Sequence, residues 1–411
     1  MLDFFSKRNR KSDSKRTQSS KAMSNARKRS LFLESLEDRR LLAADFSIST
    51  AADASEAGSV FGGFTVQGIG TTAVDQIINL TIAGTATDGG TDYDSIGATV
   101  TVPAGTDPST TILVEGIVDD TLLEGNETVI VTLASLVPTA DANTINGGSN
   151  VATVEIVDND TAVVTVAVQD GTASETGPDD GAFRVSLDKT NNTGGTITVN
   201  YTMTGTATDG TDYAAVDGTA EILDGASFVD VVIDVTDDSV LEAAESVTIT
   251  LNSLTLPSNV SSANVSIDTA NDDATFNIAD NDSALLSIAA NDDTASETAT
   301  NAGQFTITLS NVSSTATTVN YSVGGTATDG TDFPTIGSSV VIPANTASVT
   351  IDVDDIVDDA IVELDETVVV TLDSVVGDDD ISIDTNNDEA TVTIADNDSA
   401  LLSIAANDDT A

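Results

Sequence analysis

The sequence contains no cysteine, no histidine and no tryptophan. The chain can therefore form no disulfide, no thiolate or imidazole metal site, and no nucleophile that depends on Cys or on a Ser–His pair. Only 4 Tyr and 11 Phe are present, which argues against stacking platforms for bases or sugars. Because cysteine is absent, its usage indicates nothing about the redox compartment.

Basic residues are almost confined to the N-terminus, where residues 1–44 hold 12 of the 14 Lys and Arg. From Asp45 onward, Arg184 and Lys189 stand against 62 Asp and Glu. A body this acidic repels nucleic acid phosphates and anionic membranes, so its natural partners are cations. The alternative is an acidic surface that only keeps a salt-adapted protein in solution, and this alternative predicts scattered acids.

Residues 1–44 are expected to form a basic, disordered export or targeting segment, because most of them are polar and charged. No window of the chain has the apolar length of a membrane span, and none has the apolar core of an ordinary signal peptide. The string Leu33–Ala44, LESLEDRRLLAA, resembles the LEPR-x-LL motif at the N-terminus of large bacterial surface proteins, although Ser35 stands where that motif often has Pro. The resemblance implies export, with processing near Ala43–Asp45. A short amphipathic helix or a nucleic-acid-binding tail is the alternative.

The rest of the chain repeats three times, with 116 to 122 residues between copies. A repeat of this length is a whole domain, far longer than the unit of a solenoid. GTATDGGTDY at 84–93 recurs at 205–213 and 325–333, and Asp-Asn-Asp occurs at 158–160, 280–282 and 396–398. Three domains are therefore expected, at 45–160, 161–282 and 283–398.

Apolar residues alternate with polar ones inside each copy, which is the period of a strand with one buried face. Seven such segments occur in the second copy, at 164–168, 183–187, 197–203, 219–223, 229–235, 247–251 and 276–278. Seven strands in about 120 residues predict an all-β fold, an immunoglobulin-like antiparallel sandwich of two sheets. Since Asp160 runs directly into Thr161 without a Pro or Gly linker, the three sandwiches are expected to form a rod-like array.

Residues 399–411 are identical to residues 283–295, which open the third domain. They are expected to be the truncated start of a fourth repeat. A lone strand has no sheet to satisfy its backbone, so this segment should be frayed. The repetition predicts that the chain is a fragment of a longer array.

The recurring acids fall at strand ends and in loops. In the second copy Glu175 follows the first strand, Asp237 and Asp238 fill the turn before the sixth, and Asp280 and Asp282 follow the last. In an antiparallel sandwich such loops can converge at one pole, where the carboxylates would repel one another unless a cation neutralised them. Six or more oxygen ligands without nitrogen or sulfur suit Ca²⁺, whereas Mg²⁺ takes fewer in a strict octahedron and Zn²⁺ favours His or Cys.

The order of these motifs resembles the Calx-β domain, which occurs in sodium–calcium exchangers, integrin β4 and many bacterial surface proteins. The order is Glu, then Gly-Thr-Ala-x-x-Gly-x-Asp-Tyr, then Asp-Asp-x-x-x-Glu-x-x-Glu, then Asp-x-Asp, and it covers about residues 45–398. The resemblance implies calcium as the bound ion and a set of carboxylate ligands in each copy. These are Glu56, Asp92, Asp119, Asp120, Glu124, Asp158 and Asp160 in the first copy; Glu175, Asp212, Asp237, Asp238, Glu242, Asp280 and Asp282 in the second; and Glu297, Asp332, Asp358, Asp359, Glu363, Asp396 and Asp398 in the third.

Two features depart from the family pattern. The acidic triplets are reduced to Asp-Asp-Thr, Asp-Asp-Ser, Asp-Asp-Ala and Asp-Asn-Asp, which predicts fewer ions or weaker binding. An extra glycine in the first copy, Gly89-Gly90, could displace Asp92. Among the other recurring residues, Asp88 and its counterparts are expected to form turns, and Tyr93 and its counterparts to plug the sandwich end. Glu127, Glu245 and Glu366 are either ligands or the solvated start of a strand, and the second is favoured.

Together these patterns predict a calcium-binding extracellular structural or adhesion array of an exported bacterial protein, with cell-surface proteins or matrix as further partners and no enzymatic activity. A calcium sensor like that of the exchangers is the alternative function. Cadherin-like repeats and calcium-binding nonapeptide repeats fit less well, because the tetrad of cadherins is missing and Gly-Gly-Thr-Asp occurs once per domain. A glycosidase with paired carboxylates is disfavoured, because every copy carries the same acids.

Overall fold

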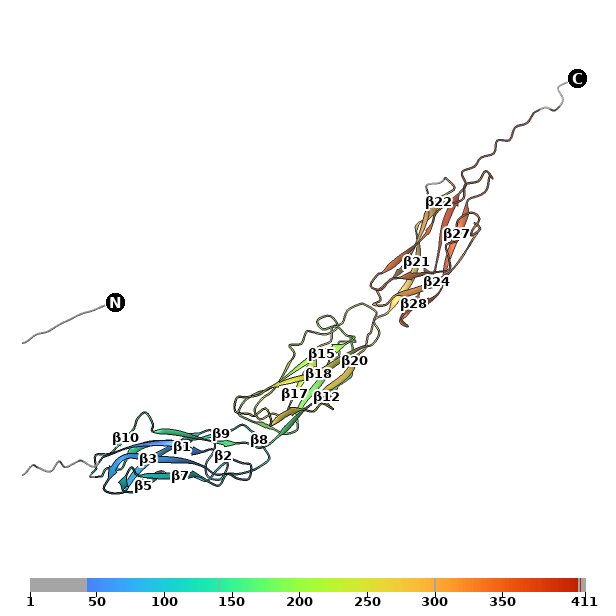
Figure 1. Cartoon of the computed structure of the whole chain (residues 1–411). Coiled ribbons are helices and arrows are strands. Elements are labelled where there is room, and N and C mark those ends of the chain that lie inside the picture. The colour runs from blue at the N-terminus through green and yellow to red at the C-terminus, as the bar shows by residue number, and fades with distance from the viewer. Residues whose placement is uncertain (1–42, 140, 299–300, 406, 408–411) are drawn as a thin grey trace, which may run out of the picture.

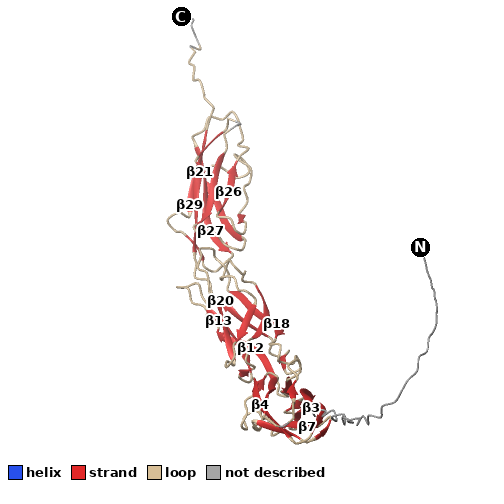
Figure 2. Ribbon diagram, turned by 90° about the vertical axis from the view of Figure 1, so that its left-hand side faces the viewer, coloured by secondary structure: helices blue, strands red, loops and turns tan. Residues whose placement is uncertain are grey.

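The computed structural model describes residues 43–139, 141–298, 301–405 and 407. These residues contain strands and no helix, and hence no helix that could cross a membrane. Three β-sandwiches follow one another end to end in a rod-like array (Figures 1 and 2). The predicted N-terminal segment, apart from Ala43 and Ala44, lies outside the described residues.

The first sandwich is made of two five-stranded sheets, one with β10-β1-β3-β6 and β7, the other in the order β2-β11-β9-β4-β5. Its fold begins at Ala44, whose N–H donates to Asn143 Oδ1 at 2.7 Å. The strands are β1 (Ala44–Ala52), β2 (Ala54–Ser55), β3 (Gly62–Thr72), β4 (Gln76–Gly84), β5 (Thr99–Val102), β6 (Gly105–Thr106), β7 (Ser109–Val114), β8 (Leu123–Glu124), β9 (Glu127–Leu136), β10 (Thr144–Ile145) and β11 (Val151–Val157).

The second and third sandwiches repeat this plan. The second has two four-stranded sheets, in the orders β17-β13-β12-β19 and β16-β15-β18-β20. The third has one four-stranded sheet, β26-β23-β21-β28, and one five-stranded sheet, β22-β29-β27-β24-β25. The second has β12 (Ala162–Asp170), β13 (Gly181–Leu187), β14 (Asn191–Asn192), β15 (Ile197–Gly205), β16 (Thr219–Ile222), β17 (Phe228–Ile233), β18 (Glu245–Thr255), β19 (Val265–Ile267) and β20 (Asp273–Ile278). The third has β21 (Ala284–Asp292), β22 (Thr294–Ser296), β23 (Gly303–Leu309), β24 (Thr317–Gly325), β25 (Ser339–Ile342), β26 (Ser348–Val353), β27 (Glu366–Val376), β28 (Ile381–Ile383) and β29 (Glu389–Ala395).

The seven predicted strands of the second sandwich are all present. The sequence missed β14 and β19, because two or three residues are too few to show alternation. β19 pairs in parallel with β12, so the first sheet is not wholly antiparallel. The core lies between the two sheets and is filled from alternating positions, with Phe183, Val185 and Ile249 fully buried. The predicted plug is confirmed as well, since Tyr93, Tyr213 and Phe333 are each at most 2% exposed.

Adjacent sandwiches are joined by short connections, residues 158–161 and 279–283. A loop of each leading sandwich also inserts an apolar side chain into the next one. Leu123 of β8 pairs in parallel with Asn191 of β14 and belongs to the second core. Leu241 pairs with Ser313 in the same way and belongs to the third core. We call these residues the inserted leucines.

Replacing Leu123 with Ala should destabilise the second sandwich by about 2–4 kcal/mol, because it removes a fully buried side chain and leaves a cavity. The matched control is Leu122→Ala, since Leu122 is 43% exposed and its truncation should change stability by no more than about 0.5 kcal/mol. Urea unfolding of the two variants provides the comparison. Equal stabilities would show that Leu123 contributes nothing to the second core.

Candidate metal centre

The predicted ligands meet at the pole of each sandwich where the chain passes to the following residues. In the first two sandwiches they form two groups, in each of which one carboxylate oxygen per residue lies within 4.8 Å of the others. We call the group that includes the acids after the last strand the strand-end cluster, and the group that includes the Gly-x-Asp loop the loop cluster. The strand-end clusters are Glu56/Asp158/Asp160, Glu175/Asp280/Asp282 and Glu297/Asp396/Asp398, and the loop clusters are Asp92/Glu124/Glu127 and Asp212/Glu242/Glu245.

The loop clusters include an acid for which the sequence favours a solvated strand start over a ligand. Glu127 lies with Asp92 and Glu124, and Glu245 lies with Asp212 and Glu242. The signal was the second Glu of Asp-Asp-x-x-x-Glu-x-x-Glu, which recurs in all three copies. Glu127 and Glu245 are the first residues of β9 and β18, which start at the pole, so their side chains can still join the ligands there.

The third copy is less complete in its described residues. Its strand-end cluster is formed. Burial, followed by the charge of Asp332, raises the pKa of Glu366. Glu363, however, is exposed, whereas Glu124 and Glu242 are half-buried. The predicted ligand Glu363 is therefore not brought into a tight group with Asp332.

The Asp-Asp pairs lie beside the clusters and outside their tight groups. Asp238 Oδ1 accepts the Val240 N–H at 2.7 Å, which is an Asx turn. Asp237 Oδ1 accepts Asn281 Nδ2 at 3.1 Å. The other two copies repeat both bonds, through Asp119 and Asp120 and through Asp358 and Asp359. The Asn of Asp-Asn-Asp thus ties the turn to the strand end, where the family pattern would place a third charge.

One Asp in each strand-end cluster is held by the backbone. Asp280 Oδ2 accepts the Glu242 N–H at 3.0 Å, and its Oδ1 accepts the Asp282 N–H at 3.1 Å. The same pair of bonds occurs at Asp158 and at Asp396. These bonds hold the Asp-Asp-x-x-x-Glu loop at the strand end.

The glycine insertion in the first copy does not displace its ligand. Asp92 Oδ2 accepts the Thr87 N–H, as Asp212 Oδ2 accepts that of Thr208. Gly89 and Gly90 absorb the extra residue at φ 83° and 90°, a left-handed conformation that favours glycine. The possible displacement of Asp92 is thus contradicted.

The electrostatics of the clusters are those of crowded, half-buried acids. Burial, followed by the charges of Asp158, Glu124 and Asp120, raises the pKa of Glu56 to about 8. Burial and the charges of Asp280 and Asp238 raise the pKa of Glu175 to about 8. The same causes raise the pKa values of Glu124 to about 7, of Glu127 to about 8 and of Glu245 to about 7.

Carboxylate oxygens at these sites fit a hard cation. Five buried ones have no hydrogen-bond partner within the described part of the chain, and all belong to predicted ligands: Asp160 Oδ2, Glu175 Oε2, Asp282 Oδ2, Glu297 Oε2 and Asp398 Oδ2. Buried polar atoms normally have a hydrogen-bond partner or a counter-ion. For these oxygens the described residues supply none, so a bound cation is a suitable partner. The donor set is all oxygen, which suits Ca²⁺.

A protein cation reaches one cluster. Lys189 Nζ lies 2.8 Å from Asp160 Oδ1, across the first connection between sandwiches. Arg184 instead binds Asp230 on the face of a sheet. In the clusters of the second and third sandwiches, no Lys or Arg of the described residues lies within ion-pair distance of a carboxylate. Neutralisation there comes from protons or from a cation in solution.

Acidification should stabilise the metal-free protein. Because the folded pKa of Glu56 and Glu175 lies near 8 and the unfolded value is near 4.5, the folded state binds more protons between these limits. Stability is therefore highest below about pH 4.5 for these groups and is lost as the pH rises through 8. Urea midpoints of metal-free protein should fall from pH 5.5 to pH 8. A midpoint that rises over this interval would contradict the burial of ionised acids at the pole.

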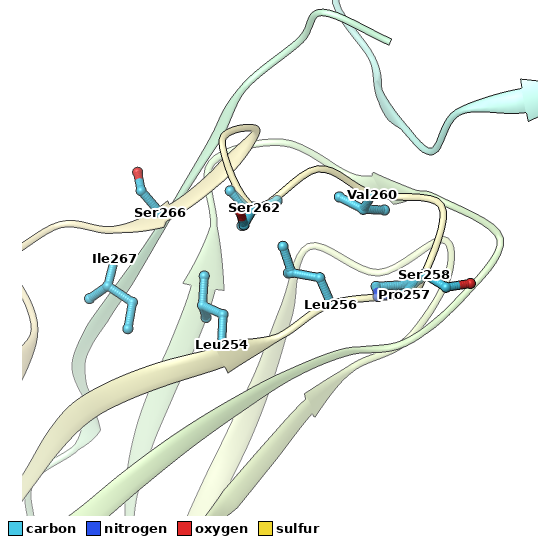
Figure 3. A pocket seen from close by; sticks show the side chains of 9 residues that line it. Leu254, Leu256, Pro257, Ser258, Val260, Ser262, Ser266 and Ile267 are labelled. Carbon is cyan, nitrogen blue, oxygen red and sulfur yellow. The ribbon is translucent and has the colours of Figure 1, made fainter. Parts of the chain in front are cut away.

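An apolar pocket of about 530 Å³ lies elsewhere, between β18, β19 and the loop that joins them (Figure 3). Leu254, Leu256, Val260 and Ile267 line it together with serine and proline, and no acid does. It is therefore separate from the carboxylate clusters.

The model of the Calx-beta domain family matches residues 53–160, 158–282 and 279–398. The chain belongs to the Calx-beta family. Calx-beta domains are structural or regulatory modules that generally bind Ca²⁺. This decides in favour of the Calx-beta resemblance over the cadherin and nonapeptide alternatives. Among curated proteins none matches the chain.

Several solved structures match parts of the chain at low identity. The calcium-binding domain CBD12 of CALX1.1 is 18% identical, with a TM-score of 0.24, over 56% of this chain and 99% of its own. Invasin, a bacterial integrin-binding protein, is 10% identical, with a TM-score of 0.25, over 86% and 60%. The Escherichia coli adhesin FdeC is 12% identical, with a TM-score of 0.24, over 86% and 98%. The family assignment rests on the family model alone.

Proposed function

We propose that this chain is a calcium-binding structural array of the cell surface, in which Ca²⁺ stiffens the joints between tandem Calx-beta sandwiches. The observation that carries the proposal is the position of the strand-end clusters. Asp158 and Asp160 belong to the first connection between sandwiches, and Asp280 and Asp282 belong to the second. An ion held there would tie the end of one sandwich, its inserted-leucine loop and the connection together.

The first joint supports this proposal through contacts on both sides. Asn264 of the second sandwich donates to the Asp158 carbonyl at 3.2 Å, and Lys189 binds Asp160. An ion that fixes Asp158 and Asp160 would therefore also restrict the next sandwich, to which both residues are bonded. The chain's own residues orient the ligands; calcium, when bound, would supply the charge that offsets their repulsion.

Small-angle X-ray scattering of the full chain with and without Ca²⁺ tests the structural role. In calcium the three sandwiches should give a longer and more uniform particle, because free movement at the two joints is reduced. Variants that lose the strand-end acids, such as Asp280→Asn with Asp282→Asn, should behave in calcium like the untreated protein in chelator. Scattering curves that do not change with calcium would contradict the proposal.

The ligand set we propose is the one predicted from the sequence, with Glu127, Glu245 and Glu366 added. Export follows from the N-terminal motif, and the proposed partners beyond calcium are surface proteins or matrix. Recovery of the intact N-terminus from the cytosol in cell fractionation would contradict export. No catalytic role is proposed, because the same acids recur at each pole.

A calcium sensor is the second candidate, favoured by the raised pKa values, which indicate a cluster under electrostatic strain without an ion. The calcium concentration that changes the shape separates the two. A sensor responds at micromolar Ca²⁺, whereas a surface array is saturated only at extracellular, millimolar levels.

A further inference from the structure

The loop that carries the inserted leucine has the same conformation in all three sandwiches. In the third, Asp359 Oδ1 accepts the Ile361 N–H at 2.7 Å, and Asp396 Oδ2 accepts the Glu363 N–H at 2.8 Å. These bonds match those around the inserted leucines Leu123 and Leu241. Val362 holds the corresponding position in the third loop.

The surroundings of this loop differ at the third sandwich. Leu123 and Leu241 are fully buried in the sandwich that follows, whereas Val362 is 51% exposed. Ile361 and Leu364 beside it are 59% and 87% exposed. Three neighbouring apolar side chains on this loop form an exposed apolar patch at the distal pole of the third sandwich.

We propose that this patch, through Val362 and Leu364, forms a docking surface for the proximal pole of a Calx-beta sandwich of the third sandwich's kind. The two joints already present establish how such a surface is used. At the second joint the Leu241 N–H donates to the Val312 carbonyl and the Ser314 N–H donates to the Leu241 carbonyl, both at 2.9 Å. The partner must therefore offer a free backbone carbonyl and a free backbone N–H in the loop that corresponds to the one between β23 and β24. We call this loop the first hairpin and these two groups its free edge.

The first sandwich does not offer this edge. Ala73 is the counterpart of Ser314, and its N–H is already bonded to Asp141 Oδ2 at 3.0 Å. Thr72 and Gln76, which flank this hairpin, are buried. A second copy of the chain that presented its first sandwich would find this donor occupied, so simple end-to-end association of copies is disfavoured.

The second sandwich does not fit either. Gly125 of the first joint lies so close to Asn259 that an added Cβ would come within 1.9 Å of the Asn259 side-chain nitrogen. Leu364 is the counterpart of Gly125 and carries a whole isobutyl group. Asn259 belongs to the long loop 256–264, whereas the third sandwich joins the same strands through residues 377–380. Leu364 thus selects a partner with the short loop.

The chain around the patch agrees with this choice. The ten residues 396–405 are identical to 280–289, the connection that enters the third sandwich. Leu402 and Ile404, the counterparts of buried Leu286 and Ile288, are fully exposed. A partner of the third kind would surround the patch, residues 396–405, Leu402 and Ile404 in the way that their counterparts are surrounded at the second joint.

Cysteine labelling tests the proposal, because the chain contains no cysteine. Val362→Cys is compared in the full chain, in the full chain extended by residues 296–398, and in a chain whose residue 398 is followed by 161–282. The first extension completes a second copy of the third sandwich, and circular dichroism checks that each added copy is folded. Leu241→Cys serves as the buried reference.

The extension by residues 296–398, which we call the third-kind extension, should slow maleimide labelling of Val362→Cys at least tenfold, toward the rate of Leu241→Cys. The chain in which 161–282 follows residue 398 is called the second-kind extension. The second-kind extension should leave the labelling fast, and Leu364→Gly in that chain should slow it by removing the clash with Asn259. Equal, fast labelling in the full chain and the third-kind extension would overturn the docking surface. Equal protection by both extensions would overturn the selection by Leu364.

Discussion

The full chain should melt roughly 10 °C higher in saturating calcium than in chelator. A ligand that binds only the folded state adds about 2.7 kcal/mol at a hundredfold excess over its dissociation constant, and 1 kcal/mol shifts the melting temperature of a domain of this size by about 4 °C. The physical reason is specific to the poles. Buried oxygens such as Glu175 Oε2 and Glu297 Oε2 have no partner in the described residues, and an ion would supply one.

Two controls make this result interpretable. Magnesium at the same concentration should give a smaller shift, because it dehydrates reluctantly and needs a stricter geometry. Sodium chloride of equal ionic strength should give a still smaller one, since screening acts on all surface acids alike. A calcium shift no larger than the salt shift would favour a solubilising acidic surface over a metal site.

Replacing Glu175 with Gln should have opposite effects with and without calcium. Glu175 is 4% exposed, and its pKa is raised to about 8 by burial and by Asp280 and Asp238. In chelator at pH 8, the neutral amide removes part of this repulsion, so the second sandwich should melt higher. In calcium the same change removes a charged ligand, and most of that sandwich's calcium stabilisation should be lost.

The matched control is Glu221→Gln in β16, which makes the same chemical change at an exposed position of the same sandwich. It should change the free energy of unfolding by no more than about 0.5 kcal/mol in both conditions. Scanning calorimetry of the two variants in calcium and in chelator measures the four values. If Glu175→Gln and Glu221→Gln lose the calcium shift equally or not at all, Glu175 is not a ligand.

Much of the fold could be predicted because its determinants are local. Alternation along β12, β13 and β15 fixes which face of each strand is buried, and repetition supplies two further copies for comparison. The short parallel strands could not be predicted, because β14 forms only where the loop of another sandwich lies beside it. From the sequence of its own repeat, Leu123 is a loop residue. The residues that bury it belong to the second sandwich.

The candidate site was predictable to the extent that each ligand type recurs at a fixed place. Repetition located Glu175, Asp212 and Asp280, but it could not show that the acids divide into two groups. It also could not place Glu245, since the first residue of a strand can face the pole or the solvent. The role of Asn281, which bonds Asp237, depends on how two distant loops meet and is not visible along the chain.

Isothermal titration of the full chain with calcium is the decisive measurement of whether the clusters bind the ion. We expect saturable binding that involves all three sandwiches, proton release on binding at pH 7 because raised carboxyl pKa values must fall, and loss of the second sandwich's share in Glu175→Gln. Heats no different from dilution in metal-free protein, with the fold intact, would contradict calcium binding by the clusters.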